Sequence, residues 1–192
     1  MNWKLIPGEY EIGNKKSSVA VLTLLDNFSF DKNKVAIYGK VMTENLGVTR
    51  ILANILSNKN IRYLVVCGRD VNGHYPGDAL ISFYNQGYTE DKKTNIITIK
   101  NTRAKDPKLP IEEIGKVRER FRNQITLVNM LGEKDIKKIK SKIEKLLEKN
   151  SSPMSCPYKV KLKKAENLGI FIQDNIAIHS KINLNNFYIM RR

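Results

Sequence analysis

The residues best suited to chemistry lie in a short loop that follows the most apolar strand-like run of the sequence. Residues 67–78 read Cys-Gly-Arg-Asp-Val-Asn-Gly-His-Tyr-Pro-Gly-Asp, with Gly68, Gly73 and Gly77 around a single histidine, His74. Glycines let a backbone turn tightly and approach a bulky ligand closely. A neutral imidazole nitrogen on such a loop is a common ligand of transition metals. We therefore interpret His74 as a candidate metal ligand.

Few other side chains could complete a metal site. The sequence holds two histidines and two cysteines, and Cys67 and Cys156 lie far apart without a CxxC motif. A structural zinc site takes four protein ligands, so an all-protein site is not expected. One histidine suffices where a macrocycle supplies the other ligands, which favours a corrinoid or a haem. The alternative is that the loop histidine is an ordinary turn residue, as we expect of His179 beside Ile178.

Alternating strand-like and helix-like runs position this loop. Apolar runs predict strands at residues 18–25, 34–41, 61–67, 95–100 and 125–130, and amphipathic runs predict helices at 43–57, from about 78, 111–123 and 133–149. This order predicts an α/β fold with a Rossmann-like, mostly parallel sheet and helices on both faces. In such sheets ligands bind beyond the carboxyl ends of the strands, where the His74 loop begins.

Local signals add three expectations around this loop. Thr43 is expected to cap the first helix, with Glu44 in its first turn. Pro76 biases Tyr75 toward extended backbone. Cys67 lies at the end of a buried strand, which suggests a packing role rather than a nucleophile.

The pattern of the sequence changes from long amphipathic runs to short β-like runs at residues 150–153, Asn-Ser-Ser-Pro. Short β-like runs follow at 160–162, 169–173, 176–178 and 187–190. We therefore expect a main domain over residues 1–150 and a small β-rich C-terminal appendage over residues 151–192.

The composition of the chain limits where the protein is expected to reside and which kinds of partner it is expected to bind. Lysine and arginine number 34 against 19 acidic residues, which gives a net charge of +15. This charge favours anionic partners, although scattered lysines are also typical of a solvated surface. Without an apolar run of about 18 residues or a signal peptide, we expect a cytoplasmic protein. With 8% aromatic residues and no recognisable motif, nucleic-acid binding is the least favoured function.

The ordered motifs around the loop resemble the A subunit of tetrahydromethanopterin S-methyltransferase. The resemblance covers about residues 7–149 and is carried by residues 43–48 (Thr-Glu-Asn-Leu-Gly-Val), 51–58 and 60–68, and by Gly73-His74 with Gly77. Residues 74–77 also match the His-x-x-Gly half of the corrinoid-binding pattern Asp-x-His-x-x-Gly, with Asn72 in place of the aspartate.

The resemblance implies a Rossmann-like domain that binds cobalamin (a cobamide), with His74 as the lower axial ligand of cobalt. The other residues expected at the cofactor are Gly68, Gly73, Gly77, Thr43, Glu44 and Asn45. It also implies a component of an archaeal methyltransferase of methanogenesis, which passes a methyl group from methyl-tetrahydromethanopterin through cobalt to coenzyme M with the help of other subunits. The family usually carries a C-terminal membrane anchor, which this sequence lacks, so we expect a soluble variant. The alternative is a pterin- or folate-linked one-carbon accessory protein that keeps the fold without cobalamin.

Overall fold

The computed structural model describes residues 3–163, 182–183 and 188–189, and its centre is a five-stranded mixed sheet. The strands lie in the order β1 (Tyr10–Ile12), β3 (Ile37–Gly39), β2 (Val19–Leu22), β4 (Tyr63–Gly68) and β7 (Thr126–Leu131). β3, β2, β4 and β7 are parallel, and β1 pairs antiparallel with β3. The predicted α/β class and mostly parallel sheet are therefore confirmed, whereas β1 was not predicted.

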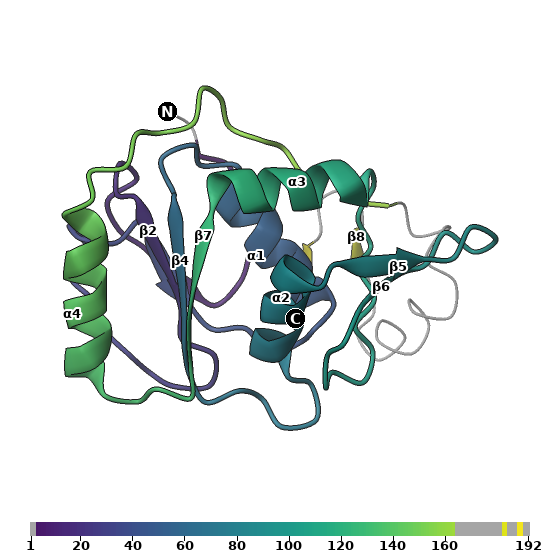
Figure 1. The fold of residues 1–192 in the computed structure, drawn as a ribbon, viewed down its shortest axis with the longest axis horizontal. Coiled ribbons are helices and arrows are strands. Elements are labelled where there is room, and N and C mark those ends of the chain that lie inside the picture. Colours follow the sequence, from purple (N-terminus) through teal and green to yellow (C-terminus); the bar gives the residue numbers. More distant parts are fainter. Residues whose placement is uncertain (1–2, 164–181, 184–187, 190–192) are drawn as a thin grey trace.

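Helices cover both faces of this sheet (Figure 1). α1 (Leu46–Leu56), α2 (Pro76–Asn85) and α3 (Ile114–Gln124) lie on one side, and α4 (Ile136–Leu147) lies on the other. The central strands explain this arrangement, because successive side chains of a strand point to opposite faces. In β2, Ala20 packs with the core under α1 to α3, while Val19 and Val21 pack with Ile139 of α4. A strand buried on both faces reads as a continuous apolar run, which is why β2 and β4 were predictable.

Two predicted elements differ from the structure, one in its position and the other in the residue at which it begins. The predicted strand at residues 95–100 is β6 (Ile97–Ile99), which pairs antiparallel with β5 (Tyr88–Glu90) outside the main sheet. The short turn between them permits only antiparallel pairing, because a parallel pair needs a crossover of a dozen or more residues. The helix expected from residue 111 begins at Ile114, since Ile111 instead forms a β-bridge with Leu162.

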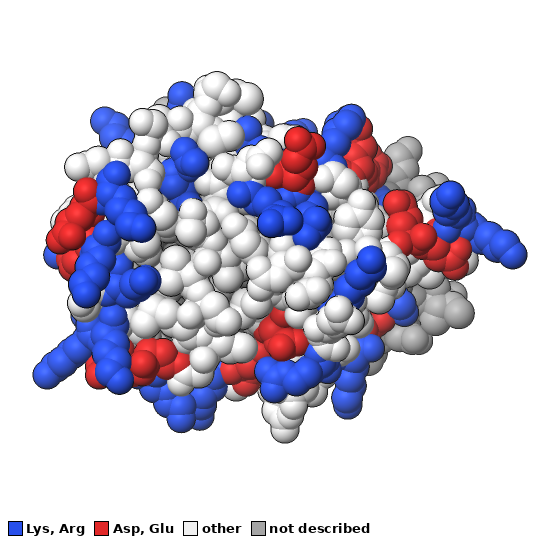
Figure 2. All heavy atoms as spheres, in the orientation of Figure 1, with Lys and Arg blue, Asp and Glu red and all other residues white. Residues whose placement is uncertain are grey.

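Basic side chains are scattered over the face in Figure 2, with acidic ones among them, and they are dense along α4, while much of the centre is uncharged. α4 exposes Lys137, Lys138, Lys140, Lys142 and Lys145. Its buried residues, Ile139, Ile143 and Leu146, form the opposite stripe of the helix. These lysines therefore form the solvated face of an amphipathic helix.

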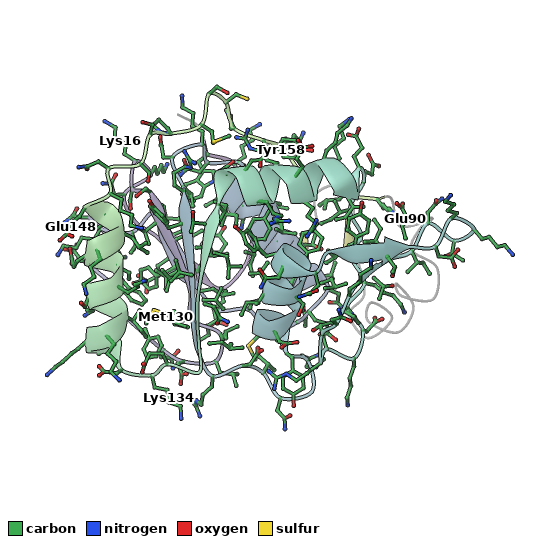
Figure 3. The ribbon with its side chains drawn as sticks, viewed as in Figure 1. Lys16, Glu90, Met130, Lys134, Glu148 and Tyr158 are labelled. Carbon is green, nitrogen blue, oxygen red and sulfur yellow. The ribbon has the colours of Figure 1, made fainter. Side chains whose placement is uncertain are left out.

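The segment after α4 runs along the main domain. The backbone N–H of Met154 donates to the carbonyl of Lys59, and that of Tyr158 donates to the carbonyl of Leu56. Figure 3 shows Tyr158 beside α3, where the guanidinium of Arg120 lies 5.9 Å from its ring centroid. Nearer the C-terminus, two short strands, β8 (Ile182–Asn183) and β9 (Tyr188–Ile189), pair antiparallel with each other.

Much of the expected C-terminal appendage lies outside the described residues, as do the runs at 169–173 and 176–178 and His179. The division into a domain of residues 1–150 and an appendage of residues 151–192 therefore stays a prediction. Within the described stretches, no helix has both the length and the apolar content needed to cross a bilayer.

Candidate functional site

The candidate site lies at the carboxyl ends of the parallel strands. β3 and β4 flank β2 in the sheet, so the chain moves to opposite sides of β2 as it forms them. The loop after β3 leads to Glu44, and the loop after β4 leads to His74. Met130 and Lys134, labelled in Figure 3, mark the same end of the sheet beside β4. Such a switch in strand order is where open α/β sheets bind ligands.

Glu44 and His74 meet at this place. Nδ1 of His74 lies 2.9 Å from Oε2 of Glu44, and the other carboxylate oxygen accepts a 3.0 Å hydrogen bond from the backbone N–H of Asp106. The Glu44 side chain is only 2% exposed, whereas that of His74 is 54% exposed. The buried carboxylate therefore fixes the orientation of an imidazole that reaches solvent.

This contact also decides which ring nitrogen of His74 is available. A carboxylate can only accept hydrogen bonds, so Nδ1 carries the hydrogen and donates it to Glu44. In the neutral ring, Nε2 then keeps its lone pair. Among the described residues, Nε2 of His74 has no hydrogen-bond partner. A ligating histidine whose second nitrogen donates to a carboxylate is the usual arrangement at protein-bound metals.

The neighbours of Glu44 hold the backbone that presents it. Asn45 is the N-cap of α1, and its side-chain oxygen accepts a hydrogen bond from the N–H of Leu46. The hydroxyl of Thr43 accepts one from the N–H of Gly47 at 3.0 Å. Our assignment of Thr43 as the cap, with Glu44 in the first turn, was therefore wrong. Glu44 precedes the helix, and its carboxylate contacts His74 across the site.

The three glycines of the loop have separate structural reasons. Gly68 and Gly73 both have φ of +82°, a conformation that side-chain-bearing residues rarely adopt. A Cβ on Gly68 would also lie 2.4 Å from the carbonyl oxygen of Thr23. A Cβ on Gly77 would lie 2.9 Å from methyl carbons of Leu24 and Leu131. Gly73 therefore turns the loop just before His74, whereas Gly68 and Gly77 permit close packing at its two ends.

The backbone of Tyr75 differs from our expectation. Tyr75 has φ 46° and ψ 50°, a left-handed conformation, although Pro76 favours extended backbone at this position. Its N–H donates to the carbonyl of Val71 in a tight turn, and its hydroxyl donates to Asn72. The guanidinium of Arg103 lies 4.6 Å from its ring centroid. These contacts outweigh the local preference, and α2 begins at Pro76 rather than near Asp78.

Two aspartates shape the site and were missed from the sequence. One oxygen of Asp70 accepts a hydrogen bond from the N–H of Gly77, and the other accepts one from the N–H of Asp78, so Asp70 caps α2 from a distance in sequence. Asp78 in turn accepts hydrogen bonds from the hydroxyl of Thr102 and the N–H of Arg103. The sequence does contain a signal for Asp70, because an aspartate a few residues before a helix that begins with proline can cap that helix. The usual N-cap rule considers only the residue directly before the helix, so it does not identify Asp70.

Cys67 is not available as a nucleophile. Burial, and to a lesser degree the charge of Asp26, raises the pKa of its thiol to about 12. The thiol donates to the carbonyl of Leu22 inside the sheet. This agrees with the packing role expected from the sequence.

The residues of the site fit a metal that brings most of its own ligands. His74 offers one oriented imidazole nitrogen, backed by a buried carboxylate. In the part of the chain that the structure describes, no three histidine, cysteine, aspartate or glutamate side chains gather into a metal-binding group. The site thus offers a single nitrogen donor, Nε2 of His74, with the carboxylate of Glu44 behind the ring.

Comparison with known proteins identifies similar chains. The family model that describes the A subunit of tetrahydromethanopterin S-methyltransferase matches residues 1–170. The A subunit of this methyltransferase from Methanosphaera stadtmanae is 38% identical over 148 residues, which are 76% of this chain and 57% of the relative. The first of the numbered A subunits from Methanothermobacter thermautotrophicus is 35% identical over 150 residues, which are 77% of this chain and 61% of the relative.

A further relative is closer in length. The second of the numbered A subunits of tetrahydromethanopterin S-methyltransferase from Methanobrevibacter ruminantium is 35% identical over 151 residues, which are 78% of this chain and 76% of the relative. Relatives therefore differ in how much they contain beyond the matched region, and this chain spans about three fifths of the length of the first two.

Proposed function

The chain belongs to the family of the tetrahydromethanopterin S-methyltransferase A subunit, and from this premise we propose that it is a cobalamin-binding methyl carrier. The main domain is then a Rossmann-like corrinoid domain, with His74 as the lower axial ligand of cobalt. Bound cobalamin would supply a cobalt centre that accepts and releases a methyl group. The proposed donor is methyl-tetrahydromethanopterin, the proposed acceptor is coenzyme M, and the proposed setting is the cytoplasm, with other methyltransferase subunits as partners.

One observation carries this proposal: the hydrogen bond from Nδ1 of His74 to the buried carboxylate of Glu44. An ordinary surface histidine does not need a buried carboxylate, and burying one is costly unless it is hydrogen-bonded. Here the cost is offset by two donors, His74 and the N–H of Asp106. Such an arrangement fixes the orientation of the ring, as the carboxylate partner of a metal-bound histidine does.

The surrounding residues have separate tasks in this function. Thr43 and Asn45 fix the start of α1 and thereby the position of Glu44. Asp70 fixes the start of α2, directly after the histidine. Gly73 allows the sharp turn before His74. Together they hold an imidazole whose side chain stays 54% exposed.

The test uses cobinamide, a corrinoid without its own nucleotide base, so that an axial nitrogen can come only from the protein. The purified chain is titrated anaerobically with cobinamide, and the visible spectrum and the electron paramagnetic resonance of the Co(II) form are recorded. We expect saturable binding and a nitrogen splitting of the cobalt signal. Both are expected to be lost in His74→Ala.

His179→Ala is the matched control, because it removes the only other histidine. This variant should bind cobinamide and show the nitrogen splitting as the unaltered chain does. The proposal fails if the unaltered chain takes up no corrinoid, or if His74→Ala keeps the nitrogen splitting. Binding of a pterin without corrinoid uptake would instead support the accessory-protein alternative.

A further inference from the structure

A cavity lies between α1 and the β1–β3 edge of the sheet, apart from the His74 loop. It has a volume of about 770 Å³, within the range of small-molecule sites. Apolar residues of three elements line it, among them Leu22, Ile37 and Ile51. The segment 7–10 forms another wall. The cavity is therefore built from the first third of the chain rather than from the loop that carries His74.

The wall formed by the N-terminal segment is fixed to α1. The side chain of Asn54 accepts a hydrogen bond from the N–H of Ile6 at 2.7 Å and donates one to its carbonyl at 3.0 Å. The indole N–H of Trp3 donates to the carbonyl of Asn54. These contacts order the segment that closes the cavity, so the cavity is a fixed feature of the described fold.

Arg50 gives this cavity an unpaired charge. Its side chain lines the cavity, and its Nε is buried without a hydrogen-bond partner among the described residues. None of the described carboxylates forms an ion pair with it. Burial lowers the pKa of the guanidinium. A half-buried guanidinium without a carboxylate beside it is suited to bind an oxyanion ligand.

The other charged residues of the lining do not supply that anion. Glu9 lines the cavity, but its carboxylate is 68% exposed and pairs with Nζ of Lys40 at 3.1 Å. The charges of Glu9 and Lys40 cancel each other. Arg50 therefore leaves one net positive charge on the mostly apolar lining of the cavity. The guanidinium can donate two parallel hydrogen bonds to a carboxylate, phosphate or sulfonate.

We propose that this cavity binds a small molecule that carries an oxyanion on an apolar body, with the oxyanion hydrogen-bonded to Arg50. The apolar body packs between Ile51 of α1 and Ile37 of β3. This site is additional to the proposed corrinoid function and does not depend on His74.

The test compares two fluorescent probes of the same shape, anilinonaphthalene sulfonate, which carries an anion, and neutral phenylnaphthylamine. Both are titrated into the full chain and into Arg50→Met, which removes the charge and keeps an apolar side chain. We expect the variant to bind the sulfonate about tenfold more weakly, as for loss of one charged hydrogen bond. Its affinity for the neutral probe should be unchanged.

Further variants separate charge from shape. Arg50→Lys, which keeps the charge, should retain a preference for the sulfonate. Ile51→Trp, which fills the cavity, should weaken the binding of both probes. Two controls should bind the probes as the unaltered chain does. One is Arg122→Met, which removes an exposed arginine of α3, and the other is His74→Ala. Circular dichroism and thermal unfolding establish that each variant is folded.

Competition identifies the oxyanion. Naphthyl phosphate and naphthoate should displace the sulfonate probe, and the stronger competitor tells whether phosphate or carboxylate is preferred. Inorganic phosphate at the same concentration should displace much less, since it lacks the apolar body. The proposal is overturned if folded Arg50→Met binds the sulfonate as tightly as the unaltered chain. It is also overturned if Ile51→Trp changes neither affinity, or if inorganic phosphate competes equally with naphthyl phosphate.

Discussion

At the scale of single residues, the candidate site combines an exposed imidazole with a buried carboxylate. The imidazole of His74 reaches solvent, whereas Glu44, 30 positions earlier, is only 2% exposed and holds the ring through Nδ1. Because Glu44 also accepts the N–H of Asp106, it connects the His74 loop to the segment that follows β6. Removal of either side chain should therefore have distinguishable effects.

Glu44→Ala should weaken cobinamide binding by about 10- to 100-fold, the usual loss when the carboxylate behind a metal-bound histidine is removed. Glu44→Gln should retain most of the affinity, because its amide oxygen can still accept from Nδ1. Titration of both variants with cobinamide measures this difference. Equal affinity of Glu44→Ala and the unaltered chain would contradict the orienting role of Glu44.

Asp26 should make stability depend on pH. Burial alone would raise the pKa of its carboxyl group, but hydrogen bonds from the side chain and backbone N–H of Arg69, together with its charge, hold the pKa below the usual value. A lowered folded-state pKa stabilises the fold above the unfolded value of about 3.9, and this stability is lost as the pH falls.

Asp26→Asn should therefore lower the free energy of unfolding by about 1–2 kcal/mol at neutral pH. The difference from the unaltered chain should shrink as the pH falls below about 4. Urea unfolding at several pH values measures both effects. A difference that stays constant from neutral to acid pH would show that the ionised carboxylate is not what stabilises this contact.

At the scale of elements, the two helices beside the site begin where nearby polar side chains satisfy their free N–H groups. Asn45 serves α1 locally, whereas Asp70 serves α2 across seven and eight positions. Asp70→Ala should cost about 1–2 kcal/mol of stability, as loss of a helix cap does. Urea unfolding measures this cost, and Asp70→Asn should lose less because one side-chain acceptor remains. An unaltered midpoint in Asp70→Ala would rule out this capping role.

The close packing at Gly68 provides a second test at this scale. Gly68 and Gly132 have φ of +82° and +87°, but only a Cβ on Gly68 would meet a backbone atom, at 2.4 Å, whereas one on Gly132 would meet nothing within 4 Å. Gly132→Ala should cost about 1 kcal/mol for the strained backbone. Gly68→Ala should cost at least about 2 kcal/mol because the clash is added. Similar thermal unfolding midpoints for the two variants would contradict the clash.

At the scale of the whole molecule, Gln124 connects the end of α3 to α1 and to the segment between α1 and β4. It is 1% exposed, and its amide nitrogen donates to the carbonyls of Ile55, Asn58 and Ile61. Gln124→Leu would leave these buried acceptors unpaired, so we expect a loss of about 2–3 kcal/mol. Denaturant unfolding measures it, and Asn123→Leu on the exposed neighbour is the control. A loss no larger than that of the control would mean that the carbonyls find other partners.

The sequence by itself was enough to determine the α/β class, the strands β2, β3, β4 and β7, and His74 as the residue to test. These depend on local patterns: apolar runs buried on both faces, amphipathic helices and a glycine-rich turn. The position of β6 outside the main sheet and the left-handed Tyr75 were not predicted. β6 pairs with β5 across a short connection. At Tyr75, the turn to Val71 and the contacts with Asn72 and Arg103 outweigh the preference that Pro76 imposes.

Only the tertiary structure decided which residues act together. Glu44 reaches His74 because β3 and β4 end on either side of β2, a neighbourhood that no spacing in the chain reveals. Arg50 likewise looks like one more basic residue of an amphipathic helix until the fold buries its Nε and places the side chain in the wall of a mostly apolar cavity. The reason is physical: local patterns fix the direction and burial of each element, whereas the surroundings of a charge depend on how distant elements pack.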